Sequence, residues 1–545
     1  MMISANKAPT GPLLLDCTLR DGGYYTQWDF NPALVRDYLD AMSAACIDYV
    51  ELGLRGSRNA AFAGAHAYTT DDYLRSLSLP PKLKVGVMVN AGDILDDGKG
   101  GAGRIGQLFA PVSQSPVSLV RLACHAHEVA EVMPAARELK GLGYIVGVNL
   151  MQIAGRSDDE VVALAACVDS EVVDVLYFAD SLGSLGPERV VELIGLLRRG
   201  WSGDLGIHTH DNMGRALQNT VAAADAGVRW LDSTVTGMGR GPGNAATEYV
   251  VLEFADRRSN PGNPLKLLET IRRHFGPLKA KHQWGSNPYY YLAGKYAIHP
   301  TYVQTMLGDP RFQETEILSV IRHLQDTGAS KFAAEVLQTG RHRYTAKVEG
   351  TWTPESLVAG REILLLGAGP SLASHKAAVE SYIRAARPLV MALNVEQVID
   401  ESLVDVRSAC HPLRLLADWE RYGDLDCPLI LPLAQQDERF REAVVSVRCL
   451  DFGLTVAPGC YQFGASSAVV PHMLVAAYAL SIAASGRAER VLLAGFDGFT
   501  AGDPRQQEMQ DTLSLFQTSA PAVPVFSITP TRYDLDIRSV YGLLS

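Results

Sequence analysis

Residues 13–21, LLLDCTLRD, join a short apolar run to a polar segment that continues into two glycines. The same unit, a short β-prone run followed by a helical pattern, recurs through the first half of the chain. Predicted strands cover residues 13–21, 49–54, 82–89, 118–124, 144–151, 172–180, 204–211 and 230–239. Between them, apolar residues recur at three- and four-residue steps, as amphipathic helices require. Eight β-then-α units over about 250 residues predict a closed parallel (β/α)8 TIM barrel rather than an open doubly wound sheet.

The second half of the chain changes its pattern twice. Strand signals vanish over residues 264–337, and a polar stretch with glycine and proline follows. From residue 362 the alternation of strands and helices resumes, with predicted strands at 362–366, 388–393, 429–433, 444–450, 490–494 and 523–528 and a helix from about 467 to 484. A glycine-rich turn after the first of these strands predicts a Rossmann-like open-sheet α/β domain. The predicted boundaries are a barrel over 1–262, a helical extension over 263–340, a linker over 341–360 and the Rossmann-like domain over 361–545.

Composition narrows the class of protein. The 545 residues are 47% hydrophobic and carry a net charge of −11 without a basic block, so binding to nucleic acid is not expected. Eight scattered cysteines without a CxxC pair indicate a reducing, cytoplasmic setting. We find neither a signal peptide nor an apolar run of about 18 residues, and therefore expect no export and no membrane span.

Polar residues at the predicted strand ends indicate a metal site, because function in a βα barrel lies at the carboxyl ends of its strands. Asp21 closes the first strand, and Asn244 lies in the glycine-rich loop after the eighth. His208 and His210, two apart on the seventh strand, share a face. Such a set of nitrogen and oxygen ligands, which leaves coordination positions open, suits Mn²⁺ or Mg²⁺, with Zn²⁺ or Co²⁺ as alternatives. The competing interpretation is a pair of barrel histidines that only form hydrogen bonds to their neighbours.

Further polar residues are candidates for contact with a substrate. We expect Arg20 to point away from Asp21 and to form a salt bridge with Glu51, which would make it a preorganised donor for a developing oxyanion. Three side chains that follow other strands could contact substrate hydroxyl groups, or could be structural polar groups: His125, Asn149 and Asp180.

Arg20-Asp21, Glu51, the HxH pair and the GNxxxE segment together resemble the DRE-TIM metallolyase superfamily. This superfamily includes hydroxymethylglutaryl-CoA lyase, isopropylmalate and homocitrate synthases, and 4-hydroxy-2-oxovalerate aldolase. The resemblance covers about residues 13–300. It implies that the four candidate ligands hold a divalent cation which chelates a 2-oxo acid or its pyruvate-type enolate, while Arg20 stabilises enolate charge. The implied activity is that of a carbon–carbon lyase of the aldolase type, acting on a 2-oxo acid and an aldehyde, with homo-oligomers common among such barrels.

Two departures from the superfamily pattern bear on the reaction. Tyr24 stands where the aldolases have a catalytic His, and a tyrosine with a reference pKa of about 10 is a poor base at neutral pH. The candidates for the base stay open: Tyr24, Tyr25, His125, His127 or a metal-bound water. Gly239 beside Arg240 replaces the Glu-Arg pair of the condensing synthases, which disfavours the alternative of an acyl-CoA-dependent Claisen condensation. The segment 287–294 resembles the helical extension of the aldolase branch, so Tyr291 is a further candidate substrate contact, unless its tyrosines only pack a helix interface.

The second domain carries a weaker resemblance. The turn GAGPSL at 367–372 and the later GFDG at 495–498 resemble Rossmann-like domains of bacterial surface-glycan enzymes, the motility-accessory and sialyltransferase-like proteins. This resemblance implies a nucleotide or nucleotide-sugar pocket close to Asn394 and formed by Gly367, Gly369, Pro370, Ser371 and Asp497. Two hypotheses follow. Either the barrel is a lyase that serves surface-glycan precursor metabolism, or the second domain is an active glycosyltransferase-like unit and the barrel regulates it.

Overall fold

The computed structural model describes residues 11–56, 62–95, 100–308, 314–327, 344, 348–395, 398–411, 414–415, 418–436, 438–499 and 503–544. The chain divides into two compact units, Met1–Thr305 with Thr327–Lys331, and Met306–Asp326 with Phe332–Ser545. Residues 328–343 and 345–347, which include the end of the predicted extension and the start of the predicted linker, lie outside the described residues. None of the described helices combines the length and the apolarity that crossing a membrane requires.

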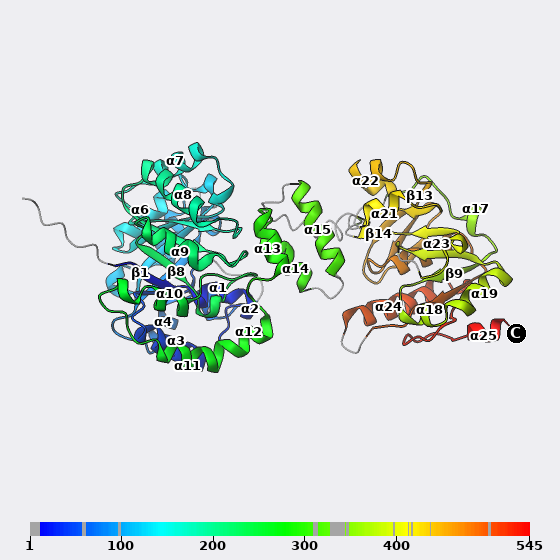
Figure 1. Cartoon of the computed structure of the whole chain (residues 1–545), viewed down its shortest axis with the longest axis horizontal. Helices are drawn as coiled ribbons and strands as arrows, with labels where there is room; N and C mark the ends of the chain where they lie inside the picture. The colour runs from blue at the N-terminus through cyan, green and yellow to red at the C-terminus, as the bar shows by residue number, and fades with distance from the viewer. Residues whose placement is uncertain are drawn as a thin grey trace, which may run out of the picture. The chain divides into compact units, whose positions relative to one another are not determined.

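The first unit is a closed barrel of eight parallel strands in sequence order, which confirms the predicted fold (Figure 1). The strands are β1 (Leu13–Asp16), β2 (Tyr49–Leu54), β3 (Lys84–Asn90), β4 (Val117–Cys124), β5 (Ile145–Leu150), β6 (Val175–Asp180), β7 (Asp204–Thr209) and β8 (Trp230–Ser233). The longer helices that follow the strands are α3 (Pro32–Ala44), α4 (Asp71–Ser76), α5 (Ala102–Leu108), α6 (Met133–Gly141), α7 (Asp158–Cys167), α8 (Pro187–Gly200), α9 (Ala216–Asp225) and α10 (Thr247–Glu253).

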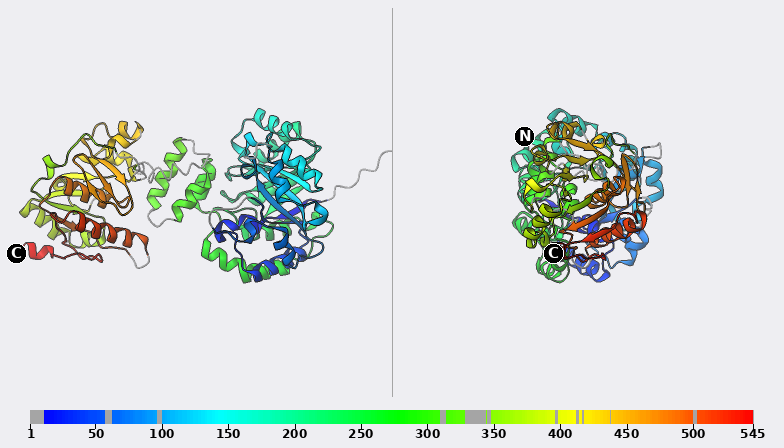
Figure 2. Two further views of the ribbon diagram at one scale, coloured as in Figure 1. Left: turned by 180° about the vertical axis from the view of Figure 1, so that it is seen from behind. Right: turned by 90° about the vertical axis from the view of Figure 1, so that its right-hand side faces the viewer.

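Two apolar layers hold the barrel. The larger lies between the strands and the surrounding helices, which the left view of Figure 2 shows on the outside of the unit. A smaller cluster fills the barrel interior and consists of Leu15, Cys17, Tyr49, Leu119, Val175, Tyr177 and Trp230. Because successive strand residues point to opposite faces, residues two places further along these strands also face inward, one layer closer to the mouth.

The first strand is shorter than predicted. It ends at Asp16, and the short helix α1 (Thr18–Asp21) begins directly after Cys17. The reason is local: the Asp16 carboxylate accepts hydrogen bonds from the backbone N–H of Thr18 at 2.9 Å and from its hydroxyl at 2.6 Å, which turns the chain out of the strand. Asp21 therefore reaches the barrel mouth from a helical turn.

The helical segment after the barrel continues the first unit. It comprises α11 (Leu265–Thr270), the π-helical turn Ile271–Phe275, α12 (Gly276–His282), α13 (Pro288–Lys295) and most of α14 (Pro300–Leu307), whereas nearly all of α15 (Glu314–Thr327) belongs to the second unit. Three hydrogen bonds attach it to the loops of the mouth. Gly285 N–H donates to Gly241 O at 3.2 Å, the indole of Trp284 donates to Thr236 O at 3.1 Å, and the Ser286 hydroxyl donates to a loop carbonyl at 2.7 Å. The segment thus covers part of the barrel mouth.

The second unit contains an open seven-stranded sheet in the order β13-β12-β11-β10-β9-β17-β18, and all its strand pairs are parallel. The strands are β9 (Glu362–Leu366), β10 (Leu389–Leu393), β11 (Val406–Ser408), β12 (Leu429–Leu431), β13 (Cys449–Asp451), β17 (Arg490–Ala494) and β18 (Val525–Ser527). Its described helices include α18 (Pro370–Ser374), α19 (Lys376–Ala386), α21 (Trp419–Gly423), α22 (Glu438–Ala443), α23 (Val475–Ser485), α24 (Pro504–Ser519) and α25 (Val540–Leu543). A small sheet is formed by β14 (Gly453–Val456), β16 (Ser467–Val470) and β15 (Gln462–Phe463).

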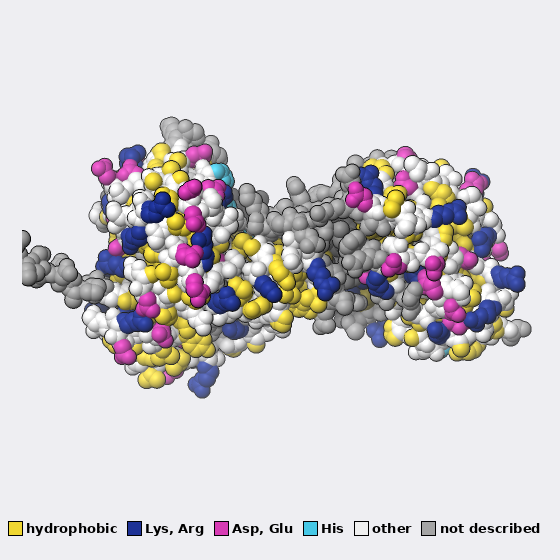
Figure 3. All heavy atoms as spheres, turned by 45° about the horizontal axis from the view of Figure 1, so that its top comes forward, with side chains coloured by type: hydrophobic (Ala, Val, Ile, Leu, Met, Phe, Trp, Pro, Cys, Tyr) yellow, Lys and Arg dark blue, Asp and Glu magenta, His cyan; other side chains and the backbone are white. Residues whose placement is uncertain are grey.

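The prediction for this unit contains one wrong element and one omission. The predicted helix from about residue 467 is strand β16 followed by α23, because Pro471 lacks the N–H that a continuous helix would need. Strand β11 was not predicted. It is only three residues long and is centred on the buried Arg407, so the sequence shows no apolar run there. On the face that Figure 3 shows, acidic and basic side chains are interspersed over both units.

Candidate functional site

Two histidines at the end of β7 present one nitrogen each to the barrel mouth. Nδ1 of His208 lies 2.9 Å from the carboxylate of Asp232, and Nδ1 of His210 lies 3.0 Å from the carbonyl oxygen of Asp180. Both partners only accept hydrogen bonds, so each Nδ1 carries the hydrogen and each Nε2 keeps its lone pair. Burial is the main cause that holds the pKa of His210 well below its ordinary value, and the charge of Arg240 acts in the same direction. Neutral imidazole is the form that binds a metal ion.

Asp21 and Asn244 approach the same nitrogen. Nε2 of His208 lies 3.4 Å from Oδ2 of Asp21 and 3.0 Å from the amide nitrogen of Asn244. An isolated β-bridge pairs His210 with Asn244, so the loops after β7 and β8 are fixed to each other. The structure thus brings the four predicted ligands together.

The amide oxygen of Asn244 provides a test of whether a cation fits there. Oδ1 is buried and has no hydrogen-bond partner among the described residues, which is unusual for a native amide. One carboxylate, one amide oxygen and two imidazoles form a mixed donor set that suits a divalent cation of the Mn²⁺, Mg²⁺ or Zn²⁺ type. The residues present therefore fit a divalent metal ion.

Cys17 also lies within ligand distance of Asp21 and His208, and the sequence reasoning did not name it. Its Sγ lies 4.0 Å from Nδ1 of His208, the nitrogen that faces Asp232, and donates to the carbonyl oxygen of Ser233 at 3.4 Å. Burial raises the pKa of this thiol well above its ordinary value. The thiol is therefore neutral, and it also donates to Oδ2 of Asp21 at 3.6 Å.

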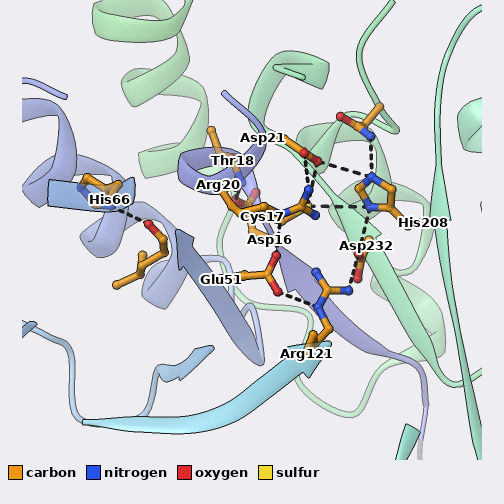
Figure 4. A network of polar contacts seen from close by, with 12 residues as sticks. Asp16, Cys17, Thr18, Arg20, Asp21, Glu51, His66, Arg121, His208 and Asp232 are labelled. Atoms are coloured by element: carbon orange, nitrogen blue, oxygen red, sulfur yellow. Dashed lines mark hydrogen bonds and ion pairs between the residues drawn. The ribbon is translucent and has the colours of Figure 1, made fainter. Parts of the chain in front are cut away.

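A closed ring of six charged or ionisable side chains surrounds the mouth, and Figure 4 shows it from close by. Arg20 contacts Asp21, and its Nε donates to Glu51 at 2.6 Å. Nε of Arg121 donates to the other oxygen of Glu51 at 2.6 Å, and its Nη1 donates to Asp232 at 2.7 Å. The contacts from Asp232 to His208 and from His208 to Asp21, given above, close the ring, which we call the charge ring. The predicted salt bridge between Arg20 and Glu51 is present.

The expected direction of Arg20 is wrong. The side chain was expected to point away from Asp21, yet the two form an ion pair. Helix α1 is the cause, because its single turn places neighbouring side chains at the same rim. One nitrogen of Arg20, Nη2, is buried without a partner among the described residues, so this N–H group is available to a further acceptor.

Arg121 and Asp232 are the residues of the charge ring that sequence reasoning missed. Each lies two residues after a member of the interior apolar cluster, as Glu51 does, so all three point inward. A signal did exist for Arg121, because it is a charged residue inside the otherwise apolar run 118–124. Burial acts to raise the pKa of Glu51, but the charges of Arg121 and Arg20 hold it below its ordinary value. All three side chains are therefore charged in the folded protein.

The two tyrosines after Asp21 lie outside the charge ring. Tyr24 is 47% exposed, and its ring lies edge-on to Trp28 and 5.4 Å from the guanidinium carbon of Arg240. The hydroxyl of Tyr25 donates to Gly241 O at 3.4 Å, and burial raises its pKa to about 12. Tyr25 therefore keeps its proton at neutral pH.

The predicted substrate contacts differ in placement. Asn149 on β5 is buried, and its amide oxygen has no partner among the described residues. His125 stacks on His127 just after β4, with 6.0 Å between ring centroids. The side chain of Asp180 accepts from two backbone N–H groups of its own loop, at 3.0 and 3.2 Å, and burial raises its pKa to about 6. Tyr291 on α13 is 44% exposed. Asn149 is thus the one of the four that presents a buried unpartnered acceptor.

In the second unit, the glycine-rich turn after β9 meets the loop after β17. Asp497 accepts from the backbone N–H of Ser371 at 3.0 Å and from its hydroxyl at 2.7 Å. Gly369 leaves room for this carboxylate, since a Cβ there would lie 2.0 Å from its Oδ2. Gly367 and Pro370 lie on either side of Gly369 in the same turn. The candidate nucleotide-binding residues thus come together. The carboxylate of Asp497 itself accepts the hydrogen bonds that Ser371 donates from the turn.

The first unit has clear relatives. The HMGL-like family model matches residues 12–274. An oxaloacetate decarboxylase of Mycobacterium tuberculosis is 28% identical over 259 residues, which are 45% of this chain and 70% of that protein. A 4-hydroxy-2-oxovalerate aldolase of Pelotomaculum thermopropionicum is 33% identical over 247 residues, 44% of this chain and 68% of that protein.

A solved structure agrees with these matches. The N-terminal domain of a Bacteroides vulgatus protein assigned to the aldolases is 31% identical, with a TM-score of 0.50, over 54% of this chain and 96% of that domain. The family match falls on the strands that carry the charge ring and the candidate ligands. The chain therefore belongs to the HMGL-like family of the DRE-TIM superfamily, and it is a carbon–carbon lyase of the aldolase type.

Proposed function

We propose that the barrel is a divalent-metal-dependent aldolase that makes or breaks the carbon–carbon bond next to a 2-oxo acid, through a pyruvate-type enolate. The observation that carries this proposal is the approach of Asp21 and Asn244 to Nε2 of His208, with His210 beside them. These four residues would hold the ion. A bound dication supplies Lewis-acid polarisation of the keto oxygen.

The side chains of the charge ring prepare the site for this chemistry. Asp232 orients the imidazole of His208 and favours the tautomer that directs Nε2 outward. Arg20 is fixed by two carboxylates, Asp21 and Glu51, and its remaining Nη2 can donate to an oxygen that gains negative charge. Because donors held in advance need no reorganisation, they stabilise an enolate more than a mobile arginine would.

Other residues would bind and protonate the substrate. The amide of Asn149 offers a buried acceptor for a substrate hydroxyl. Tyr25 stays protonated at neutral pH, and the more exposed Tyr24 beside it can exchange a proton with solvent. We assign Tyr24 as the group that relays a proton at the mouth. A Tyr24→Phe variant should then retain metal affinity and lose turnover.

The test is pyruvate release. The Mn²⁺-loaded protein is incubated with a panel of 4-hydroxy-2-oxo acids, and pyruvate is measured with a coupled dehydrogenase. His208→Ala should lose at least about 100-fold in rate, since the loss of an electrophilic group costs several kcal/mol. His274→Ala is the matched control, because that histidine lies on the helical segment and pairs with Asp37 of α3. Equal pyruvate release from wild type and His208→Ala would remove the basis of the proposal.

We propose a second function for the C-terminal unit, as a Rossmann-like domain that binds a nucleotide or nucleotide sugar and links the barrel to surface-glycan precursor metabolism. The amide oxygen of Asn394 supports it, because it is buried without a partner among the described residues and follows β10 at the carboxyl edge of the sheet. The β9–β10 register places it beside the glycine-rich turn. Ligands of open parallel sheets bind at this edge, close to the point where the strand order reverses, which here lies between β9 and β17.

Calorimetric titration with CMP, UDP and GDP sugars tests this second function. Binding of one of them that Asn394→Ala weakens, and that the barrel variant His208→Ala leaves unchanged, would support the assignment. If none of these nucleotide sugars produces heat of binding, the glycine-rich turn has only a structural role.

A further inference from the structure

Arg240 is a cation at the barrel mouth without an acidic partner. The residue lies in the loop after β8, four places before Asn244, and its side chain is half-buried. Among the described residues its closest recorded side-chain contact is the ring of Tyr24, 5.4 Å from the guanidinium carbon. The other arginines of this mouth, Arg20 and Arg121, each contact two acidic groups. A half-buried guanidinium without a counter-ion is the arrangement that binds an anionic ligand.

The loop that carries Arg240 is held in place. Gly243 N–H donates to the carbonyl oxygen of Arg240 at 3.3 Å, and the hydrogen bond from Gly285 to Gly241 attaches the loop to the helical segment. Gly241 also packs against the ring of Tyr290, since a Cβ there would lie 3.1 Å from it. These contacts on both sides of Arg240 fix its backbone. The direction in which its side chain leaves the backbone is therefore fixed.

Two uncharged groups lie within reach of the charge of this guanidinium, His299 and Tyr25. Burial, followed by the charge of Arg240, lowers the pKa of His299 to about 4, so this imidazole is uncharged at neutral pH. The same positive charge acts on Tyr25, which keeps its proton at neutral pH. No acidic group of the described first unit has its pKa lowered chiefly by Arg240. Among the described residues no acidic side chain forms an ion pair with Arg240.

We infer that Arg240 binds a second anionic group on the substrate, so that the barrel acts on 2-oxo acids which carry a carboxylate or phosphate at the end away from the keto group. This inference rests on the proposed function, because the 2-oxo acid end lies at the candidate metal ligands. Arg20 is held at that end of the substrate by its contacts with Asp21 and Glu51. A planar guanidinium can form two parallel hydrogen bonds to either anion.

The experiment compares two 2-oxo acids of equal length. Calorimetry measures the binding of 2-oxoglutarate and of 2-oxovalerate, which differ only in a terminal carboxylate or methyl group, to the Mn²⁺-loaded protein. Wild type should bind 2-oxoglutarate about tenfold more tightly, which corresponds to about 1.4 kcal/mol. Arg240→Met should lose this preference and keep the affinity for 2-oxovalerate, whereas Arg240→Lys should keep part of it. Arg272→Met, at an exposed position on the π-helical turn, is the control.

The outcomes separate the two proposals. A 2-oxo acid that ends in a phosphonate is the third probe, and tighter binding of it than of 2-oxoglutarate would identify phosphate as the natural group. Equal binding of the two C5 acids by wild type, or a preference that survives in Arg240→Met, would overturn the role of Arg240 and leave the 2-oxo acid site intact. Absence of Mn²⁺-dependent binding for all three acids would overturn the proposed function as well.

Discussion

Replacing Asp232 by Asn tests the charge ring through a single charge. Oδ2 of Asp232 lies 2.9 Å from Nδ1 of His208 and 2.7 Å from Nη1 of Arg121, while its Oδ1 has no partner among the described residues. An Asn at this position can put its oxygen in the place of Oδ2 and its NH₂ group in the place of Oδ1. The substitution therefore keeps the shape and both acceptor contacts, and it removes the charge.

The expected losses of metal affinity and of stability follow from the contacts of Asp232 with His208 and with Arg121. Loss of a carboxylate behind a metal-binding histidine typically costs about 10–100-fold in metal affinity. Arg121 is fully buried and keeps only Glu51 as an ionic partner, so we expect a further loss of about 3 kcal/mol in the stability of the metal-free barrel. This figure is at the low end for an uncompensated buried charge, because the amide oxygen still accepts from the guanidinium.

Calorimetric titration of the metal-free protein with Mn²⁺ measures the affinity, and thermal melting measures the stability. Asp204→Asn is the matched control: this aspartate, at the start of β7, pairs with Arg229 at 2.9 Å, and its side chain is 37% exposed. Such a surface pair contributes about 0–1 kcal/mol. Asp232→Asn protein that binds Mn²⁺ as tightly as wild type would refute the reasoning, as would an equal loss in Asp204→Asn.

Three further predictions concern other parts of the structure. Gly239→Ala places a Cβ 1.9 Å from Oδ1 of Asn244 and should lower Mn²⁺ affinity by at least about tenfold. Gly106→Ala is the control, because no atom lies within 4 Å of its Cβ, and it should leave the Mn²⁺ affinity unchanged in the same titration. If Gly239→Ala binds normally, Asn244 is not a ligand. Burial lowers the pKa of His66 to about 4, so the unfolded chain takes up a proton below pH 6.5 while the folded one does not. Wild-type stability should therefore fall by about 3 kcal/mol as the pH drops from 6.5 to 4, and melting of His66→Gln should show a flatter pH dependence; parallel curves would contradict this. Asp497→Ala should lower the free energy of unfolding of the second unit by about 1–3 kcal/mol, because it leaves a buried backbone N–H unsatisfied. Faster proteolysis of this unit would reveal the loss. Unchanged proteolysis would show that the turn does not need the carboxylate.

Local patterns in the sequence were sufficient for the barrel and for the candidate ligands. The alternation of apolar runs and helical periods depends only on neighbouring residues, and parallel strands bring their carboxyl ends to one edge whatever the details. Asp21, His208, His210 and Asn244 could therefore be grouped before their distances were known. The helix expected near residue 467 failed for an equally local reason, since Pro471 interrupts a composition that otherwise favours a helix.

The charge ring was decided by the tertiary structure. Arg121 and Asp232 lie on strands that are far apart in sequence, and they meet only because barrel closure brings inward-facing positions of these strands to one level. The direction of Arg20 likewise depends on a helical turn that begins earlier than the strand pattern indicated. The sequence by itself determined the alternating elements of the barrel and the candidate ligands, whereas closure of the barrel decided which charges neutralise one another and left Arg240 without an acidic partner among the described residues. The physical reason is that strand register and closure are collective properties of the whole barrel, while periodicity is a property of short segments.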